Sequence, residues 1–226
     1  MEKKEGLKLT EEVLDDVLTG GTILGGGGGG DPVKGRKYAK IAVDYTDLRL
    51  VPIEEIDDDA VLLTASLVGA PNARDQFMTA KDLAYTIEMI KKNTDLKLGG
   101  IITNEQAAEA SANGWLQAAI SGLPLVDAPC NGRAHPTGVM GSMNLHKQKD
   151  YRTVQACVGG KPETGNHVEC FFEASIEHTS KLVRMASIEA GGLVAVARNP
   201  VTASYAKESC AVGGVSFAIE TGKAFR

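Results

Sequence analysis

The chain has few cysteines, no long apolar run and no excess of positive charge, and each absence excludes a class of protein. The four cysteines, Cys130, Cys157, Cys170 and Cys210, form no CxxC pair, which excludes a zinc ribbon or a disulfide scaffold. No apolar stretch approaches the ~20 residues of a membrane-spanning helix, and the N-terminus lacks the apolar core of a secretory signal. These absences predict a cytoplasmic protein with reduced thiols. The net charge of -5 argues against nucleic acid or an anionic membrane as a partner.

What is present is typical of a globular protein. Hydrophobic residues make up 43% and charged residues 23% of the 226 residues, enough to bury one sizeable core. No internal repeat or linker divides the chain, so we expect residues 1–226 to form a single α/β domain. Apolar strands alternate with amphipathic helices, which predicts a layered α/β fold with a mostly parallel sheet flanked by helices.

Local signals place the expected elements along the chain. Thr10 is a good N-cap for a first helix, which we expect to stop at Gly20 and Gly21. Two apolar segments, 151–160 and 167–175, are joined by turn residues and predict a β-hairpin. The remaining strands are expected at 48–53, 60–69, 98–103, 123–129 and 193–198, and the remaining helices at 32–42, 73–92, 105–122, 177–192 and within the last 25 residues.

The stretch GTILGGGGGGDP, residues 21–32, places six glycines directly before helix-start chemistry. Glycine costs roughly 0.5–1 kcal/mol relative to alanine in regular structure, so such a run is either never ordered or ordered where side chains would obstruct. Asp31 and Pro32 suit the N-cap and first position of a helix, whose positive end would favour an anion. No Walker lysine follows and no strand precedes, so the run is not a nucleotide fingerprint. A surface loop without a ligand is the alternative.

Three loops follow the expected parallel strands, where ligands collect in open α/β sheets. They are VGAPNA after residue 67, TNEQ after residue 102 and DAPCNGRAHP after residue 126. Glu105, at the end of a strand and the start of a helix, is the best single acid/base candidate. An ordinary glutamate stabilised by the helix dipole is the alternative.

The third loop carries four reactive side chains within nine residues. Asp127 supplies a carboxylate, Cys130 a thiol, Arg133 a guanidinium and His135 an imidazole. Cys130 could act as a nucleophile with His135 as its base, or both could bind a metal. Alternatively, Cys130 is a small packed residue, and Arg133 pairs with Asp127 to hold the loop.

A possible zinc half-site lies further along the chain. His167 and Cys170 form an HxxC pair, but residues three apart on a strand point to opposite faces. A structural role for these two side chains is therefore favoured, and no cofactor is predicted. A zinc hydrolase using Cys130, His135 and His167 stays open as an alternative, and metal analysis would settle it.

Taken together, these motifs resemble a family long labelled a domain of unknown function, number 917. Its members are described as S-methyl-thiohydantoin desulfurase-like or hydantoinase-related. The resemblance covers nearly the whole chain and rests on GGGGDP, the GAP turn and the GRA-x-P loop after an aspartate. The positions that match this pattern are Gly27, Gly28, Gly29, Gly30, Asp31, Gly69, Ala70, Pro71, Glu105, Asp127, Gly132, Arg133 and Pro136.

This resemblance implies an enzyme that hydrolyses a hydantoin, a thiohydantoin or a similar small cyclic amide. Glu105 or Asp127 would activate water, and amides of the glycine run would stabilise charge on the ring. Arg133 would bind a substrate carboxylate, and His135, Gly69 and Ala70 would complete the binding site.

The sequence also departs from the family pattern. EQAAEA, residues 105–110, lacks the two glycines and the asparagine usual there, and Pro129 replaces a second acid. Family chains usually continue into a β-rich domain, which we expect to be absent after Arg226. The alternative hypothesis is therefore a non-catalytic binding or regulatory subunit that completes its site with a separate polypeptide. A homo-oligomer is the other partner arrangement considered.

Overall fold

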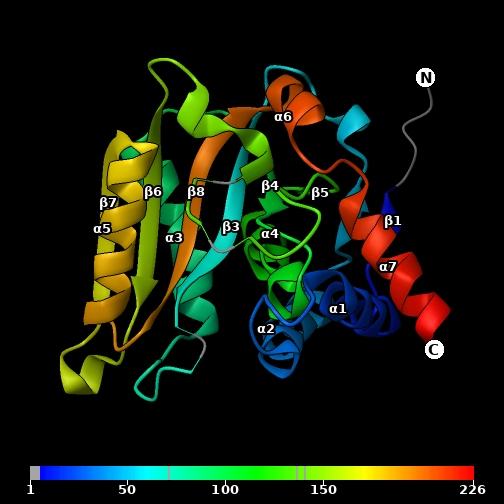
Figure 1. Cartoon of the computed structure of the whole chain (residues 1–226), viewed down its shortest axis with the longest axis horizontal. Helices are drawn as coiled ribbons and strands as arrows, with labels where there is room; N and C mark the ends of the chain where they lie inside the picture. Colours follow the sequence, from blue (N-terminus) through cyan, green and yellow to red (C-terminus); the bar gives the residue numbers. More distant parts are fainter. Residues whose placement is uncertain (1–5, 71, 136, 140) are drawn as a thin grey trace.

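The computed structural model describes residues 6–70, 72–135, 137–139 and 141–226. These residues form an eight-stranded sheet with the order β1-β2-β5-β4-β3-β8-β6-β7 (Figure 1). The strands are β1 Leu7–Lys8, β2 Arg49–Val51, β3 Val61–Gly69, β4 Leu98–Thr103, β5 Leu125–Val126, β6 Arg152–Gly159, β7 Val168–Ser175 and β8 Leu193–Thr202.

Helices cover both faces of this sheet. The α-helices are α1 Glu11–Gly25, α2 Pro32–Tyr45, α3 Ala80–Asn93, α4 Trp115–Ser121, α5 Ile176–Glu189, α6 Ala203–Ser209 and α7 Gly214–Phe225. Short 3-10 turns are η1 Ile53–Glu55, η2 Ala108–Ala112, η3 Gly141–Met143, η4 Leu145–Lys147 and η5 Pro162–Thr164. Within the described ranges, none of the helices combines the length and apolar character needed to cross a bilayer.

The expectation of a layered α/β fold is confirmed, but the mostly parallel sheet is wrong. The pairs β2–β5, β5–β4 and β4–β3 are parallel, whereas β3–β8, β8–β6, β6–β7 and β1–β2 are antiparallel. The predicted hairpin explains the change of direction, because β6 and β7 must run antiparallel to each other. Helix α5 then connects β7 to β8 across β6, which lies between them. As a result, β8 runs antiparallel to its other neighbour, β3.

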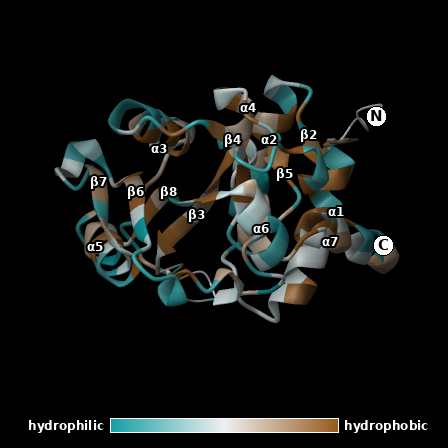
Figure 2. Cartoon of the chain, turned by 90° about the horizontal axis from the view of Figure 1, so that it is seen from above, coloured by the Kyte–Doolittle hydropathy of each residue, from teal (hydrophilic) through white to brown (hydrophobic). Residues whose placement is uncertain are grey.

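Alternating strand residues fill a separate core on each face of the sheet. Leu63 and Ala65 of β3 pack with α3 and α4, while Leu62 packs with the segment around Met143 and Leu145. The second face is completed by α5, whose Val183 packs beside the strands. Figure 2 shows a hydrophobic stretch along β3, while helices such as α1, α3 and α7 carry both hydrophobic and hydrophilic residues.

Helix α1 is longer than the sequence predicts. Thr10 is its N-cap, as expected, but the helix continues through Gly20 and Gly21 to Gly25. A Cβ at Gly20 would lie 1.9 Å from the carbonyl oxygen of Ala218 in α7, and a Cβ at Gly21 would lie 2.1 Å from Ser111 Oγ. These two glycines therefore allow close helix packing, and they do not end the helix.

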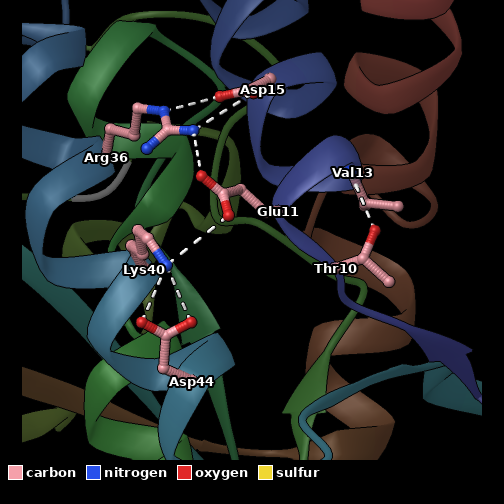
Figure 3. A network of polar contacts seen from close by, with 7 residues as sticks. All are labelled: Thr10, Glu11, Val13, Asp15, Arg36, Lys40 and Asp44. Atoms are coloured by element: carbon pink, nitrogen blue, oxygen red, sulfur yellow. Dashed lines mark hydrogen bonds and ion pairs between the residues drawn. The ribbon is translucent and has the colours of Figure 1, made fainter.

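Helices α1 and α2 are fixed to each other by ion pairs on their exposed sides (Figure 3). Arg36 of α2 lies 2.8 Å from Asp15 and 2.6 Å from Glu11, both on α1. Lys40, one turn further along α2, lies 3.5 Å from Glu11 and 2.8 Å from Asp44. Because the glycine run joins α1 to α2, this network also fixes the distance that the run must span.

The single helix expected over residues 105–122 is wrong in its first half. Residues 108–112 form only the 3-10 turn η2, and α4 begins after Gly114, whose φ is 92°. Ala108 also has a positive φ of 37°, which an alanine adopts only under tertiary constraint. The segment between β4 and α4 is therefore an irregular but buried connection.

Candidate functional site

The glycine run packs against the irregular connection after β4. Helix α1 ends with Gly26 in the left-handed region, and the carbonyl oxygen of Gly29 accepts a hydrogen bond from Ala110 N at 2.9 Å. Gly29 has a φ of 92°, and a Cβ there would lie 2.3 Å from both the Cβ and the carbonyl oxygen of Ala107. Side chains are therefore excluded from at least this part of the run by close backbone approach.

Asp31 fulfils its expected role at the start of α2. Its Oδ1 accepts a hydrogen bond from Val33 N at 2.9 Å, and its own N–H donates to Glu109 Oε2 at 3.1 Å. Burial raises the pKa of Glu109, and the hydrogen bond from Asp31 opposes that shift. The glycine run is thus fixed to the η2 segment at both Gly29 and Asp31.

The loop after β5 also packs against the glycine run. A Cβ at Gly28 would lie 2.7 Å from the Cβ of Ala134, and one at Gly26 would lie 3.9 Å from Arg133 Nη2. Arg133 is exposed. The structure thus brings Arg133 beside the glycine run, as the sequence predicts.

Glu105 lies where the two loops meet. The main-chain N–H of His135 donates to Glu105 Oε2 at 2.6 Å, and the carboxyl group is buried. Burial raises the pKa of Glu105, while this hydrogen bond and the positive charge of Arg198 oppose the shift. A carboxylate with a raised pKa and one occupied oxygen has the character of a general base.

Asp127 is directed to α7. Its Oδ1 accepts a hydrogen bond from Val215 N at 2.8 Å, and its Oδ2 accepts from the backbone N–H and the hydroxyl group of Ser216. Burial raises the pKa of Asp127, and the hydrogen bonds from Ser216 and Val215 oppose that shift. Both oxygens are therefore engaged with the first turn of α7, an arrangement that stabilises the helix N-terminus. The alternative pairing of Arg133 with Asp127 is therefore wrong, since no hydrogen bond or ion pair joins these two described residues.

Cys130, which belongs to the loop after β5, is fully buried. Its Sγ lies 3.1 Å from Thr64 Oγ1. Burial by itself raises the pKa of the Cys130 thiol. Hydrogen bonds from Cys210 and Thr64, together with the charge of Arg198, outweigh burial and leave the pKa below its ordinary value. The same contact with Cys130 raises the pKa of Cys210, so the Cys210 thiol stays protonated and acts as the donor.

Arg198 is a site residue that sequence reasoning missed. It lies on β8, opposite Thr64 of β3 and Gln155 of β6, and only 4% of its surface is exposed. Its Nε is buried without a hydrogen-bond partner among the described residues. Burial lowers its pKa to about 10, so the guanidinium stays charged at neutral pH. The available signal was one charged residue directly after the apolar run LVAVA.

Two predicted binding residues lie at another turn. Ala70 N donates to the carbonyl oxygen of Gly192 at 2.9 Å, and a Cβ at Gly69 would lie 2.0 Å from that oxygen. Gly69, with φ 154°, therefore serves the close approach of β3 to the α5–β8 turn. Pro71 and Pro136, which also match the family pattern, lie outside the described residues.

The zinc alternative receives no geometric support. His167 Nε2 lies 3.4 Å from Asp82 Oδ1, and both line a cleft of about 440 Å³ between α3 and β7. Cys170 is the cross-strand neighbour of Cys157 in the β6–β7 hairpin, whereas Cys130 lies in the loop after β5. In the ranges that the structure describes, no three His, Cys, Asp or Glu side chains are grouped to hold a metal ion.

Comparisons with known proteins agree with this fold. The chain is similar to a crystal structure of a protein from Chromobacterium violaceum, with a TM-score of 0.75 and 22% identity. The match covers 97% of this chain and 62% of the other, so this chain spans under two thirds of that protein. At this identity the likeness shows the fold alone. A search among curated proteins finds no match.

A family model described as the S-Me-THD-like, N-terminal domain matches residues 12–164. The matched range contains the glycine run, Glu105, Asp127 and the loop through His135, whereas Arg198 and Cys210 lie beyond it. Because the match spans more than half of the chain, the resemblance seen in the sequence is confirmed. The chain belongs to the S-Me-THD-like family.

Proposed function

We propose that this protein is a hydrolase acting on a hydantoin, a thiohydantoin or another small cyclic amide. The observation that carries the proposal is Glu105, a buried carboxylate with a raised pKa that accepts a hydrogen bond from the loop after β5. Membership of the S-Me-THD-like family supports the substrate class.

In this proposal Glu105 Oε1 takes a proton from water, because Oε2 already accepts the N–H of His135. The hydroxide adds to the ring carbonyl or thiocarbonyl carbon, and the glycine run supplies N–H groups for the developing charge. Arg133, exposed beside Gly26, binds an acidic group of the substrate. Asp127 has a positioning role. Its carboxylate accepts hydrogen bonds from Val215 N and Ser216 N of α7, which fixes the start of the loop at residue 127.

The test is to incubate the purified chain with hydantoin and thiohydantoin and follow the ring-opened product by mass spectrometry. We expect turnover by the wild type, loss of turnover in Glu105→Gln, and retention in Glu163→Gln, which lies exposed in the β6–β7 turn. Equal turnover by Glu105→Gln would remove Glu105 from the mechanism. Protection against thermal unfolding by the same compounds measures binding separately; ligand at 100 times its Kd adds about 2.7 kcal/mol.

A second proposal is a ligand-binding domain that completes its site with another polypeptide. The matched family model describes an N-terminal domain, and this chain spans 62% of the related crystal structure. Thermal protection by these rings without any turnover would favour this second proposal.

A further inference from the structure

The region around Arg198 contains buried polar groups that the proposed function does not use. Arg198 Nε and Asn199 Nδ2 are buried donors without partners among the described residues, and Gln155 Oε1 is a buried acceptor in the same condition. Most buried polar groups in proteins are hydrogen-bonded, so a group of three unpartnered atoms requires an explanation.

These groups lie on one face of the sheet. Arg198 is the cross-strand partner of Gln155, so the two side chains share a face. Asn199 would normally point the other way, but its φ of 54° interrupts the alternation. Its Oδ1 accepts hydrogen bonds from Gln155 Nε2 at 3.0 Å and from Thr153 Oγ1 at 2.9 Å, which places the amide on the face of Gln155.

Arg198 also has no directly bonded counterion among the described residues. No ion pair joins it to a carboxylate within the described parts of the chain, and the ionisable groups whose charge affects it are Cys130 and Glu105. Burying a guanidinium without a paired anion is unfavourable, and a bound anion would offset that cost. A side chain with a purely structural role at position 198 would not need a positive charge.

The loop after β5 approaches this guanidinium closely at Gly138. A Cβ at Gly138 would lie 3.5 Å from Arg198 Nη1 and 2.2 Å from Ser180 Oγ, so a larger residue would intrude on both. Three residues before Gly138, the main-chain N–H of His135 donates to Glu105 Oε2, so one short stretch of this loop contacts both Glu105 and Arg198. The Arg198 region is therefore adjacent to the proposed water-activating carboxylate.

We propose that Arg198, assisted by Asn199, is a binding site for the carboxylate group formed when the ring opens. This inference rests on the proposed function. Hydrolysis of a ring amide breaks its C–N bond and places the hydroxyl group of water on the carbonyl carbon. The ring nitrogen takes a proton, and the new carboxylic acid releases one to become a carboxylate. The planar donor edge of a guanidinium matches a carboxylate in charge and geometry.

The test compares two ligands that differ only in this charge: N-carbamoylglycine, which hydantoin yields on hydrolysis, and its neutral amide. Calorimetry should show that the wild type binds the acid more tightly than the amide by about 10- to 100-fold, the range expected for a hydrogen bond to a charged group. Arg198→Gln should abolish this preference. Arg184→Gln, an exposed arginine on α5, should keep it.

Equal binding of acid and amide by the wild type, or a preference that survives in Arg198→Gln, would overturn the proposal. Should Arg198→Gln fail to fold, arginine Nε–H resonances of the wild type give a second measurement. The Arg198 resonance, assigned with Arg198→Lys, should shift with the acid and not with the amide; an unmoved resonance overturns the proposal. Because both measurements detect binding alone, a failure of ring hydrolysis would be seen separately.

Discussion

The main-chain N–H of His135 donates a 2.6 Å hydrogen bond to Oε2 of Glu105, across thirty residues of sequence. This bond joins the connection after β4 to the loop after β5, and it engages one oxygen of a buried carboxylate. The opposing effect of burial is larger, so the pKa of Glu105 is raised.

The raised pKa of Glu105 predicts a pH-dependent stability. The folded state binds a proton that the unfolded state releases, so the contribution of Glu105 becomes less favourable as pH rises from the ordinary glutamate value of about 4.3 toward the folded value. Glu105→Gln removes this loss. As pH rises through this range, the free energy of unfolding of Glu105→Gln should therefore increase relative to that of the wild type. Denaturant unfolding at several pH values measures the difference. A constant difference at all pH values would contradict the shift.

Two glycines of the run provide a matched pair. Gly27 and Gly29 have φ values of 95° and 92°, but a Cβ at Gly27 meets nothing within 4 Å, whereas one at Gly29 collides with Ala107. We expect Gly27→Ala to lower the free energy of unfolding by about 1–2 kcal/mol through backbone strain alone. Gly29→Ala should lower it further. Equal effects in urea unfolding would show that the contact with Ala107 is unimportant.

Asp127 is expected to stabilise α7. Asp127→Ala leaves the buried N–H of Val215 without its acceptor, which should cost about 0.5–2 kcal/mol as for other helix caps. Ser216→Ala removes only the hydroxyl contact and should cost less. Thermal unfolding of both variants measures this order. Normal stability of Asp127→Asn combined with lost turnover would instead assign Asp127 a catalytic role.

Cys130 and Arg133 are expected to differ in their effect on activity. Cys130→Ser should retain most ligand binding and turnover, because Cys130 is fully buried against Thr64 and the proposed mechanism uses water. Arg133→Ala should lose both, because the exposed guanidinium beside the glycine run is removed. Calorimetry and product analysis distinguish them. Lost turnover with intact binding in Cys130→Ser would favour covalent catalysis and replace the water mechanism.

Arg198 should reduce the stability of the ligand-free protein. Replacing a buried, unpaired guanidinium with Met removes the cost of desolvating it, so we expect Arg198→Met to keep or raise the free energy of unfolding, by up to about 4 kcal/mol. Urea unfolding without added ligand is the measurement. A loss of several kcal/mol would mean that the guanidinium has structural partners of its own.

Local chemistry in the sequence determined much of the fold. Thr10 and Asp31 cap the helices that they were expected to cap, because an N-cap depends on neighbours within three residues. The β6–β7 hairpin followed from two apolar segments and their turn, and the apolar run of β3 is a buried strand. The rule that loops at strand ends converge agrees with Arg133 beside the glycine run and with the bond from His135 to Glu105, but Gly69 and Ala70 after β3 lie at another turn.

Tertiary structure decided the rest, because the remaining features depend on contacts between distant segments. The local sequence predicts a helix end at Gly20 and Gly21, whereas in the fold these glycines allow α7 and Ser111 to pack closely against α1. The strand directions beyond β3 depend on where the hairpin docks. Arg198 lies 93 residues from Glu105 in sequence (198 − 105), and its charge acts on Glu105 only because β8 pairs with β3. No local pattern specifies that pairing, because it is the burial of both faces of the sheet that selects it.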